Sequence, residues 1–144
     1  MSRTIFGLQP ATTFADRQAR KIARINRRMD RLLAAGAPVA AGGDTLHIDM
    51  TDGSRADLTA MGATAIAAAS EALPWPESYQ TGWITKENIR IPLATPADGL
   101  ILAAGVGDHY AQIRQNGRDL KDAVLAAEND TALDSIDIEA GWPT

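Results

Sequence analysis

The sequence predicts an α+β fold that is predominantly helical, and three observations support this fold class. Residues 12–35 and 95–128 combine helix start signals with apolar residues at helical spacing. Residues 55–73 are rich in alanine, the residue with the highest helix propensity. Short segments between the helices alternate apolar and polar residues and are bounded by glycine or proline, which predicts a small antiparallel hairpin or sheet.

The composition indicates a globular core built from small side chains. Of the 144 residues, 45% are hydrophobic but only 5% are aromatic, so neighbouring elements are expected to approach closely. The chain has no cysteine, which excludes disulfides and thiolate metal sites. We recognise no secretory signal and no apolar run long enough to span a bilayer, so no membrane partner is expected.

The net charge of −4 is distributed unevenly along the chain. Residues 1–31 hold eight of the fourteen basic residues and two acids, which gives this segment a charge of +6. Residues 32–144 hold the other six basic residues and sixteen acids, which gives −10. A basic N-terminal arm on an acidic body is therefore expected.

The arm is predicted to be a long amphipathic helix. Thr12 or Thr13 caps its start, Asp16 lies in its first turn, and Gly36 ends it after about Ala35. Its apolar stripe consists of Ala15, Ile22, Ile25, Met29 and Leu32. A basic stripe on another face is the predicted attachment surface, consisting of Arg17, Arg20, Arg24, Arg27 and Arg31. Docking on the acidic body of the chain, on a neighbouring copy or on another acidic protein is favoured over nucleic acid, because aromatic residues and a recognisable DNA-binding module are missing.

The middle of the chain predicts strands around the alanine-rich helix. Residues 45–50 (TLHIDM) alternate, with His47 and Asp49 on one face. A metal site needs three or four ligands, so a solvated strand face is expected, with no metal and no cofactor. Asp52 or Ser54 is expected to cap the helix over 55–73. Residues 82–85 and 89–93 predict a hairpin with a three-residue loop.

The helix over 95–128 is the most regular feature of the sequence. Thr95 caps it, Pro96 is its first residue, and Asp98 completes an acidic capping box. Steps of four and three residues define a heptad seam: Leu102, Val106, His109, Ile113, Asn116, Leu120, Ala123 and Ala127. A seam of this length predicts a homo-oligomer, with a trimer favoured, although packing against the chain's own alanine-rich helix is the alternative.

The seam contains two polar residues, and three glycines cluster in the first turns of its helix. Its first six seam residues, Leu102 to Leu120, form the predicted oligomer interface, in which Asn116 would fix the register. His109 is expected to be a core or interface residue because no nucleophile accompanies it. Gly99, Gly105 and Gly107 imply either that the helix starts later or that something packs tightly against its first turns.

Four segments together resemble a domain of unknown function that is common in phage and prophage proteins of proteobacteria, often in tail-fibre and tail-tip-associated chains. The segments are DMTDGSRADLTAMGATAIAAA (49–69), WITKENI (83–89), DHYAQIRQNGRDLKDAVLAAE (108–128) and IDIEAGWP (136–143). The resemblance covers about residues 44–143. It implies a tail-associated α+β domain over 44–144, preceded by an extension, residues 1–43, that carries the basic helix. It supplies no catalytic residues.

The resemblance and the seam together lead us to expect a structural virion protein. It would be a small tail-tip, tail-fibre or fibre-adaptor subunit of a bacteriophage or phage-like particle, made in the bacterial cytoplasm and bound to other tail or fibre proteins. A tail-fibre assembly chaperone outside the virion is one alternative. A nucleic-acid-binding accessory protein that uses the basic helix is another. No enzyme activity is expected, because a nucleophile elbow and a phosphate-binding loop are missing.

Overall fold

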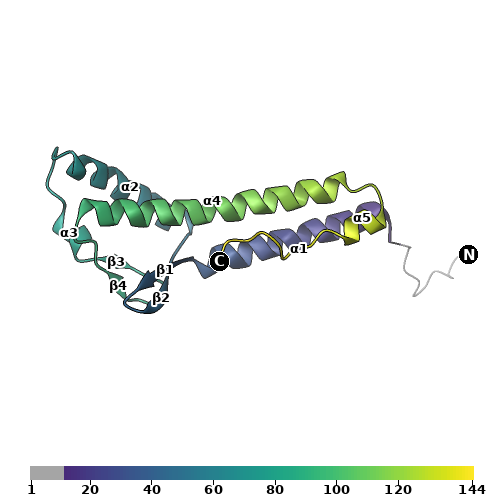
Figure 1. The fold of residues 1–144 in the computed structure, drawn as a ribbon, viewed down its shortest axis with the longest axis horizontal. Coiled ribbons are helices and arrows are strands. Elements are labelled where there is room, and N and C mark those ends of the chain that lie inside the picture. Colours follow the sequence, from purple (N-terminus) through teal and green to yellow (C-terminus); the bar gives the residue numbers. More distant parts are fainter. Residues whose placement is uncertain (1–11) are drawn as a thin grey trace, which may run out of the picture.

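The computed structural model describes residues 12–144, and its longest helix, α4 (Pro96–Ala126), runs through most of the length of the molecule (Figure 1). Helix α1 (Phe14–Ala35) packs beside the C-terminal half of α4. Helix α2 (Asp52–Ala69) packs beside the N-terminal half. Two short helices, α3 (Glu77–Gln80) and α5 (Asp130–Asp134), complete a predominantly helical α+β fold, which confirms the predicted class.

The strands form two separate antiparallel pairs. Strands β1 (Ala37–Ala41) and β2 (Asp44–Ile48) are joined by Gly42 and Gly43, both with positive φ, as a two-residue hairpin turn requires. The sequence predicts only a turn and the second strand here, because the alanines and proline of β1 have low strand propensity. Strands β3 (Trp83–Ile84) and β4 (Arg90–Ile91) form the predicted second hairpin, with Trp83 opposite Ile91.

Local capping chemistry sets the starts of the two long helices as predicted. The Thr13 hydroxyl accepts from the Asp16 N–H, and the Asp16 carboxylate accepts from the Thr13 N–H. Thr95 and Asp98 make the same reciprocal pair at the start of α4. Each box satisfies two backbone N–H groups that a helix start leaves without intrahelical partners. The sequence therefore determines where these helices begin.

Other predicted ends move by a few residues. Thr51, and not Asp52 or Ser54, caps α2, which ends at Ala69 and not near residue 73. Asn129 caps α5, and its side chain accepts from the Ala132 N–H. Thr, Asn, Asp and Ser all cap helices well, so adjacent candidates are hard to distinguish from sequence. Helix α3 is too short to produce a periodic pattern and is not predicted.

The buried stripe of α4 leaves the predicted heptad seam after Ile113. Its buried residues are Gly99, Leu102, Val106, Ile113, Gly117 and Val124. Leu102, Ile113 and Val124 are 11 residues apart, which is close to three turns of a straight helix. A strict heptad drifts by about 20° per repeat around such a helix, so its later positions fall beside the stripe. Ala123 is accordingly exposed, and Asn116 is only half-buried.

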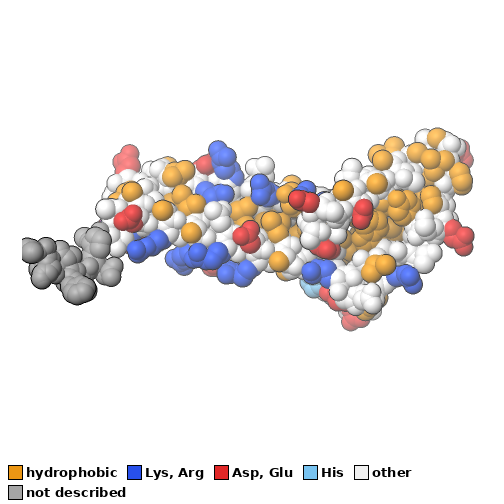
Figure 2. Space-filling view, turned by 180° about the vertical axis from the view of Figure 1, so that it is seen from behind, with side chains coloured by type: hydrophobic (Ala, Val, Ile, Leu, Met, Phe, Trp, Pro, Cys, Tyr) orange, Lys and Arg blue, Asp and Glu red, His pale blue; other side chains and the backbone are white. Residues whose placement is uncertain are grey.

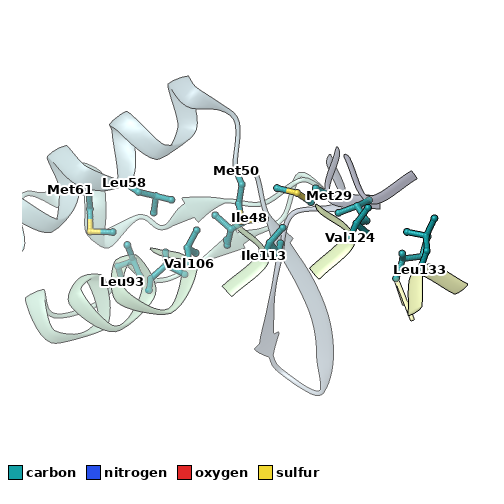
Figure 3. Packing of buried hydrophobic residues seen from close by; sticks show 14 residues of the cluster. Met29, Ile48, Met50, Leu58, Met61, Leu93, Val106, Ile113, Val124 and Leu133 are labelled. Atoms are coloured by element: carbon teal, nitrogen blue, oxygen red, sulfur yellow. The ribbon is translucent and has the colours of Figure 1, made fainter. Parts of the chain in front are cut away.

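The larger seam side chains form the core of a single chain. Leu102, Val106 and Ile113 are 6%, 2% and 0% exposed. They belong to one hydrophobic cluster with residues of α1 and α2, which extends from Met61 to Leu133 along the molecule (Figure 3). The prediction that these three residues form an oligomer interface is therefore corrected, because α1 and α2 already cover them. Leu120 also packs against this cluster.

Two buried glycines let the helices approach α4 closely. A Cβ at Gly99 would lie 2.8 Å from the Met61 Sδ and 3.0 Å from the Trp75 ring. A Cβ at Gly117 would collide with Met29 of α1. Helix α4 starts where predicted, so tight packing explains Gly99. At Gly105 and Gly107, in contrast, nothing described lies within 4 Å of the Cβ position.

Helix α1 is an integral part of the fold. Its residues Ile25 and Met29 belong to the same cluster as Val124 of α4 and Ile48 of β2. The described part of the predicted extension, residues 12–43, therefore contributes to the core, and residue 43 lies inside the β1–β2 hairpin. A boundary placed by resemblance to the later residues misses this packing. Residues 1–11 lie outside the described part of the chain.

Candidate interaction surfaces

A groove of about 420 Å³ lies between the N-terminal half of α4 and strands β1 and β4. Its walls are mostly apolar. The lining residues include Val39 of β1, Ile91 of β4, Leu93 just beyond β4, and Ile101, Gly105 and Val106 of α4. Figure 2 shows hydrophobic side chains gathered in a hollow at the end of the molecule that contains α2 and the strands. Ile101 is 72% exposed and Gly105 has no side chain, so this part of α4 is open. The groove can accept apolar groups.

The polar groups around the groove give it an acidic character. Asp98 and Asp108 of α4 both line it, whereas none of its described lining residues is lysine or arginine. Two carboxylates beside an apolar floor favour a ligand that is apolar and positively charged.

His109 lies in the groove wall, not in the buried seam. Partial burial lowers the pKa of its imidazole, and the nearby Asp108 carboxylate opposes this shift. The neutral ring, which has one donor and one acceptor nitrogen, is therefore favoured at pH 7. His109 lines the groove as a polar group, and its place in an oligomer interface stays a prediction.

A smaller hollow of about 220 Å³ lies between α2 and α4. The Arg55 guanidinium stacks over the Tyr110 ring, 4.0 Å from its centroid. Its Nη2 donates to Asp52 Oδ1 at 2.6 Å, and its Nε donates to the Met50 carbonyl at 3.3 Å. All of these contacts are internal, so Arg55 connects the start of α2 to α4.

The predicted basic stripe divides into two groups. Arg20, Arg24, Arg27 and Arg31 are exposed on the side of α1 opposite its buried residues. Among residues 12–144 the structure contains no ion pair for these four. Figure 2 shows blue side chains along the half of the molecule that contains α1. These four arginines form a charged surface, here called the arginine row, that is available to a partner.

The other basic residues of α1 hold the C-terminal part of the chain. Arg17 donates to both carboxylate oxygens of Asp130, at 2.8 and 3.1 Å. Lys21 donates to the Leu133 carbonyl at 2.5 Å. The prediction that Arg17 belongs to the attachment surface is corrected, because its guanidinium joins α1 to α5. The sequence could not distinguish it from the arginine row, because its partner is 113 residues away.

His47 also has a partner that the sequence does not show. Its backbone N–H donates to Glu87 Oε1 at 2.8 Å, and its Nδ1 lies 2.6 Å from Glu87 Oε2. These contacts, the backbone one first, lower the pKa of Glu87 to about 2. Asp49 lies beyond the end of β2 and accepts from the Thr51 N–H, so it does not share a strand face with His47. Within residues 12–144, no three metal-ligating side chains come together.

The chain belongs to the family described as Domain of unknown function (DUF4376), whose profile matches residues 16–140. The match includes α1, so the family extends further toward the N-terminus than the resemblance seen in the sequence. Comparisons with curated proteins and with solved structures gave no match. No helix in the described part of the chain is long and apolar enough to cross a membrane.

Proposed function

We propose that this member of the DUF4376 family is a non-catalytic assembly protein that binds an acidic protein surface through the arginine row of α1. The observation that carries the proposal is the row itself. From Arg20 to Arg31 it extends over about 16 Å at 1.5 Å per residue. Ile25 and Met29 fix the opposite side of the helix in the core, so the row keeps its geometry without a partner.

The chemistry of the row suits carboxylates. Each guanidinium can form two parallel hydrogen bonds with a carboxylate, which gives both strength and orientation. Nucleic acid is the less favoured partner, because the exposed side of α1 has no aromatic residue on which a base could stack.

The setting that we propose is the tail of a bacteriophage or phage-like particle. The protein would be a tail-tip, tail-fibre or fibre-adaptor subunit, located in the virion and bound to other tail or fibre proteins. Support comes from the resemblance of residues 49–69, 108–128 and 136–143 to tail-associated chains. A permanent subunit also suits a surface that is already ordered before its partner binds.

Mass spectrometry of purified particles tests this setting. We expect the chain at a fixed copy number in wild-type particles, and its loss from particles when Arg24 and Arg27 are both replaced by glutamate. Arg114→Glu is the matched control, because Arg114 is exposed on α4 away from the row. A chain that is absent from particles but bound to a fibre protein in host extracts would instead be an assembly chaperone.

Nucleic acid binding is the second candidate function, because four arginines in a row could also contact phosphates. Such binding would weaken steeply as the salt concentration rises, since each phosphate contact releases a counterion. Fluorescence anisotropy with labelled DNA and RNA at two salt concentrations distinguishes it. Binding at low salt that the Arg24→Glu/Arg27→Glu variant loses would support this candidate over the acidic protein.

A further inference from the structure

We propose that the groove beside α4 binds residues 3–8 of a second copy of this chain, so that copies associate head to tail. This inference uses a different surface from the arginine row and does not depend on it. It rests on the chemistry of the groove, the composition of residues 3–8, and the distance between the groove and the start of α1.

The groove is built to contact an apolar chain closely. Ile101 exposes 72% of its surface at the groove wall, and covering it would remove apolar area from water. Gly105 leaves open space where other residues carry a Cβ, so a partner can approach the helix backbone there. Pro38 lies at the groove in β1 and has no N–H to present to solvent.

Residues 3–8, RTIFGL, match this surface in both polarity and charge. Ile5, Phe6 and Leu8 can fill the apolar floor. Arg3 can pair with Asp98 or Asp108 at the edge of the groove, and the segment contains no acid that would be repelled.

The segment cannot fill the groove of its own chain. Gln18 donates to the Val124 carbonyl at 3.0 Å, which fixes the register between α1 and α4. Gln112, the groove residue nearest to this contact along α4, is about 18 Å away at 1.5 Å per residue, and Thr12 lies about 9 Å further out in the opposite direction. Phe6 can extend at most about 21 Å from Thr12, and Leu8 only about 14 Å. The start of α1 and the groove thus lie toward opposite ends of the molecule (Figure 1).

When the segment of one copy enters the groove of another, the pair still has one unused segment and one unused groove. Such an interface continues into a row of copies unless the rotation between neighbours closes a ring. The trimer that the sequence favours is one such ring. Its contacts would be made by residues 3–8 and the groove, because the seam residues Leu102, Val106 and Ile113 are buried inside each chain.

Light scattering of the full-length chain over a range of concentrations tests the proposal. We expect wild-type protein to self-associate, and Phe6→Asp and Ile101→Lys each to be monomeric. Ile66→Lys is the matched control, because Ile66 is 63% exposed on α2 outside the groove, and it should associate like wild type. Circular dichroism should show unchanged helix content in all three variants. A monomeric wild type, or loss of association in Ile66→Lys, would overturn the proposal.

Mixing the two defective variants separates a specific contact from general stickiness. Phe6→Asp keeps an intact groove and Ile101→Lys keeps an intact segment, so an equal mixture should form 1:1 dimers and nothing larger. A fluorescent peptide of residues 1–11 should bind Phe6→Asp protein, and its affinity for Ile101→Lys should be at least tenfold weaker. A mixture that stays monomeric, or a peptide that binds both variants equally, overturns the proposal and leaves the groove to another partner. Association should persist in Arg24→Glu/Arg27→Glu, so this test and that of the arginine row have separate outcomes.

Discussion

Asn116 of α4 donates a hydrogen bond of 2.9 Å from its Nδ2 to the carbonyl oxygen of Ala140. This contact attaches the C-terminal segment to α4, and the ion pair between Arg28 and Glu139, at 3.1 Å, attaches it to α1. Ile138 of the same segment is buried in the main cluster. Asn116 therefore helps to close the fold of one chain, which corrects its predicted role in fixing the register of an oligomer.

Replacing Gly141 with alanine should weaken this closure. Gly141 has a φ of +84°, which disfavours alanine, and an added Cβ would collide with the Asn116 side chain. We expect Gly141→Ala to lower the free energy of unfolding by about 2 kcal/mol, measured by urea denaturation. Adding Asn116→Ala to this variant should recover part of the loss, although Asn116→Ala alone should cost about 1 kcal/mol. Strictly additive losses would show that the two residues do not interact.

Glycine-to-alanine substitutions at two positions of α4 should change the free energy of unfolding in opposite directions. Gly117→Ala places a methyl group against Met29, so we expect a loss of about 1–3 kcal/mol from overpacking. Gly107→Ala meets open space and should gain about 0.5–1 kcal/mol from higher helix propensity. Thermal and urea unfolding of the two variants would measure this difference. Equal effects would mean that α1 does not pack as closely on α4 as described.

The contact between Glu87 and His47 should make stability depend on acidity. The ordinary pKa of the glutamate is 4.5, and the His47 contacts lower it to about 2 in the fold. The pKa of Glu87 is lower in the folded state than in the unfolded state. The stabilisation is therefore complete above about pH 4.5 and is lost as the pH falls toward 2.

Urea unfolding between pH 6 and pH 2 checks this dependence. Glu87→Gln should be less stable than wild type at pH 6, and the two curves should converge as the pH falls. Glu128→Gln, at an exposed position near the end of α4, is the control and should follow wild type throughout. A constant gap between Glu87→Gln and wild type would mean that the carboxylate charge is not responsible.

Substitutions at Arg17 and Arg24 should have different effects, because we expect Arg17 to stabilise the fold and Arg24 to bind a partner. Arg17→Gln breaks the exposed contact with Asp130, so we expect a loss of about 0.2–1 kcal/mol in stability and unchanged partner binding. Arg24→Gln should leave stability within about 0.5 kcal/mol of wild type and weaken partner binding. Binding to particle proteins, measured beside urea unfolding, distinguishes them. If both substitutions weakened binding equally, Arg17 would also belong to the attachment surface.

Features that depend on contacts between residues close together in the sequence were predictable. Thr13 with Asp16, and Thr95 with Asp98, determine helix starts through contacts three residues apart, and the structure contains both capping boxes. Strand β1 was not predictable in this way. Its alanines and proline become a strand because β2 pairs with them, and a two-residue turn brings β2 into place.

The groove and the division of the basic residues could not be read from the sequence. Arg17 and Arg24 have the same side chain on the same helix, and only the position of Asp130 distinguishes them. Gly105 and Gly117 likewise look alike in the chain, yet one faces open space and the other faces Met29. Such differences depend on which distant element packs against each residue.

The sequence alone determined the fold class, the starts of both long helices, and the charge contrast between α1 and the rest of the chain. These follow from capping, propensity and composition, which act locally. The tertiary structure decided which residues of α4 are buried and which helices cover them. A straight helix turns every 3.6 residues, so its buried line passes through Gly117 and Val124 and not through Asn116 and Ala123. Because α1 and α2 cover that line, the two surfaces that we propose for partners, the arginine row and the groove, lie elsewhere on the described part of the chain.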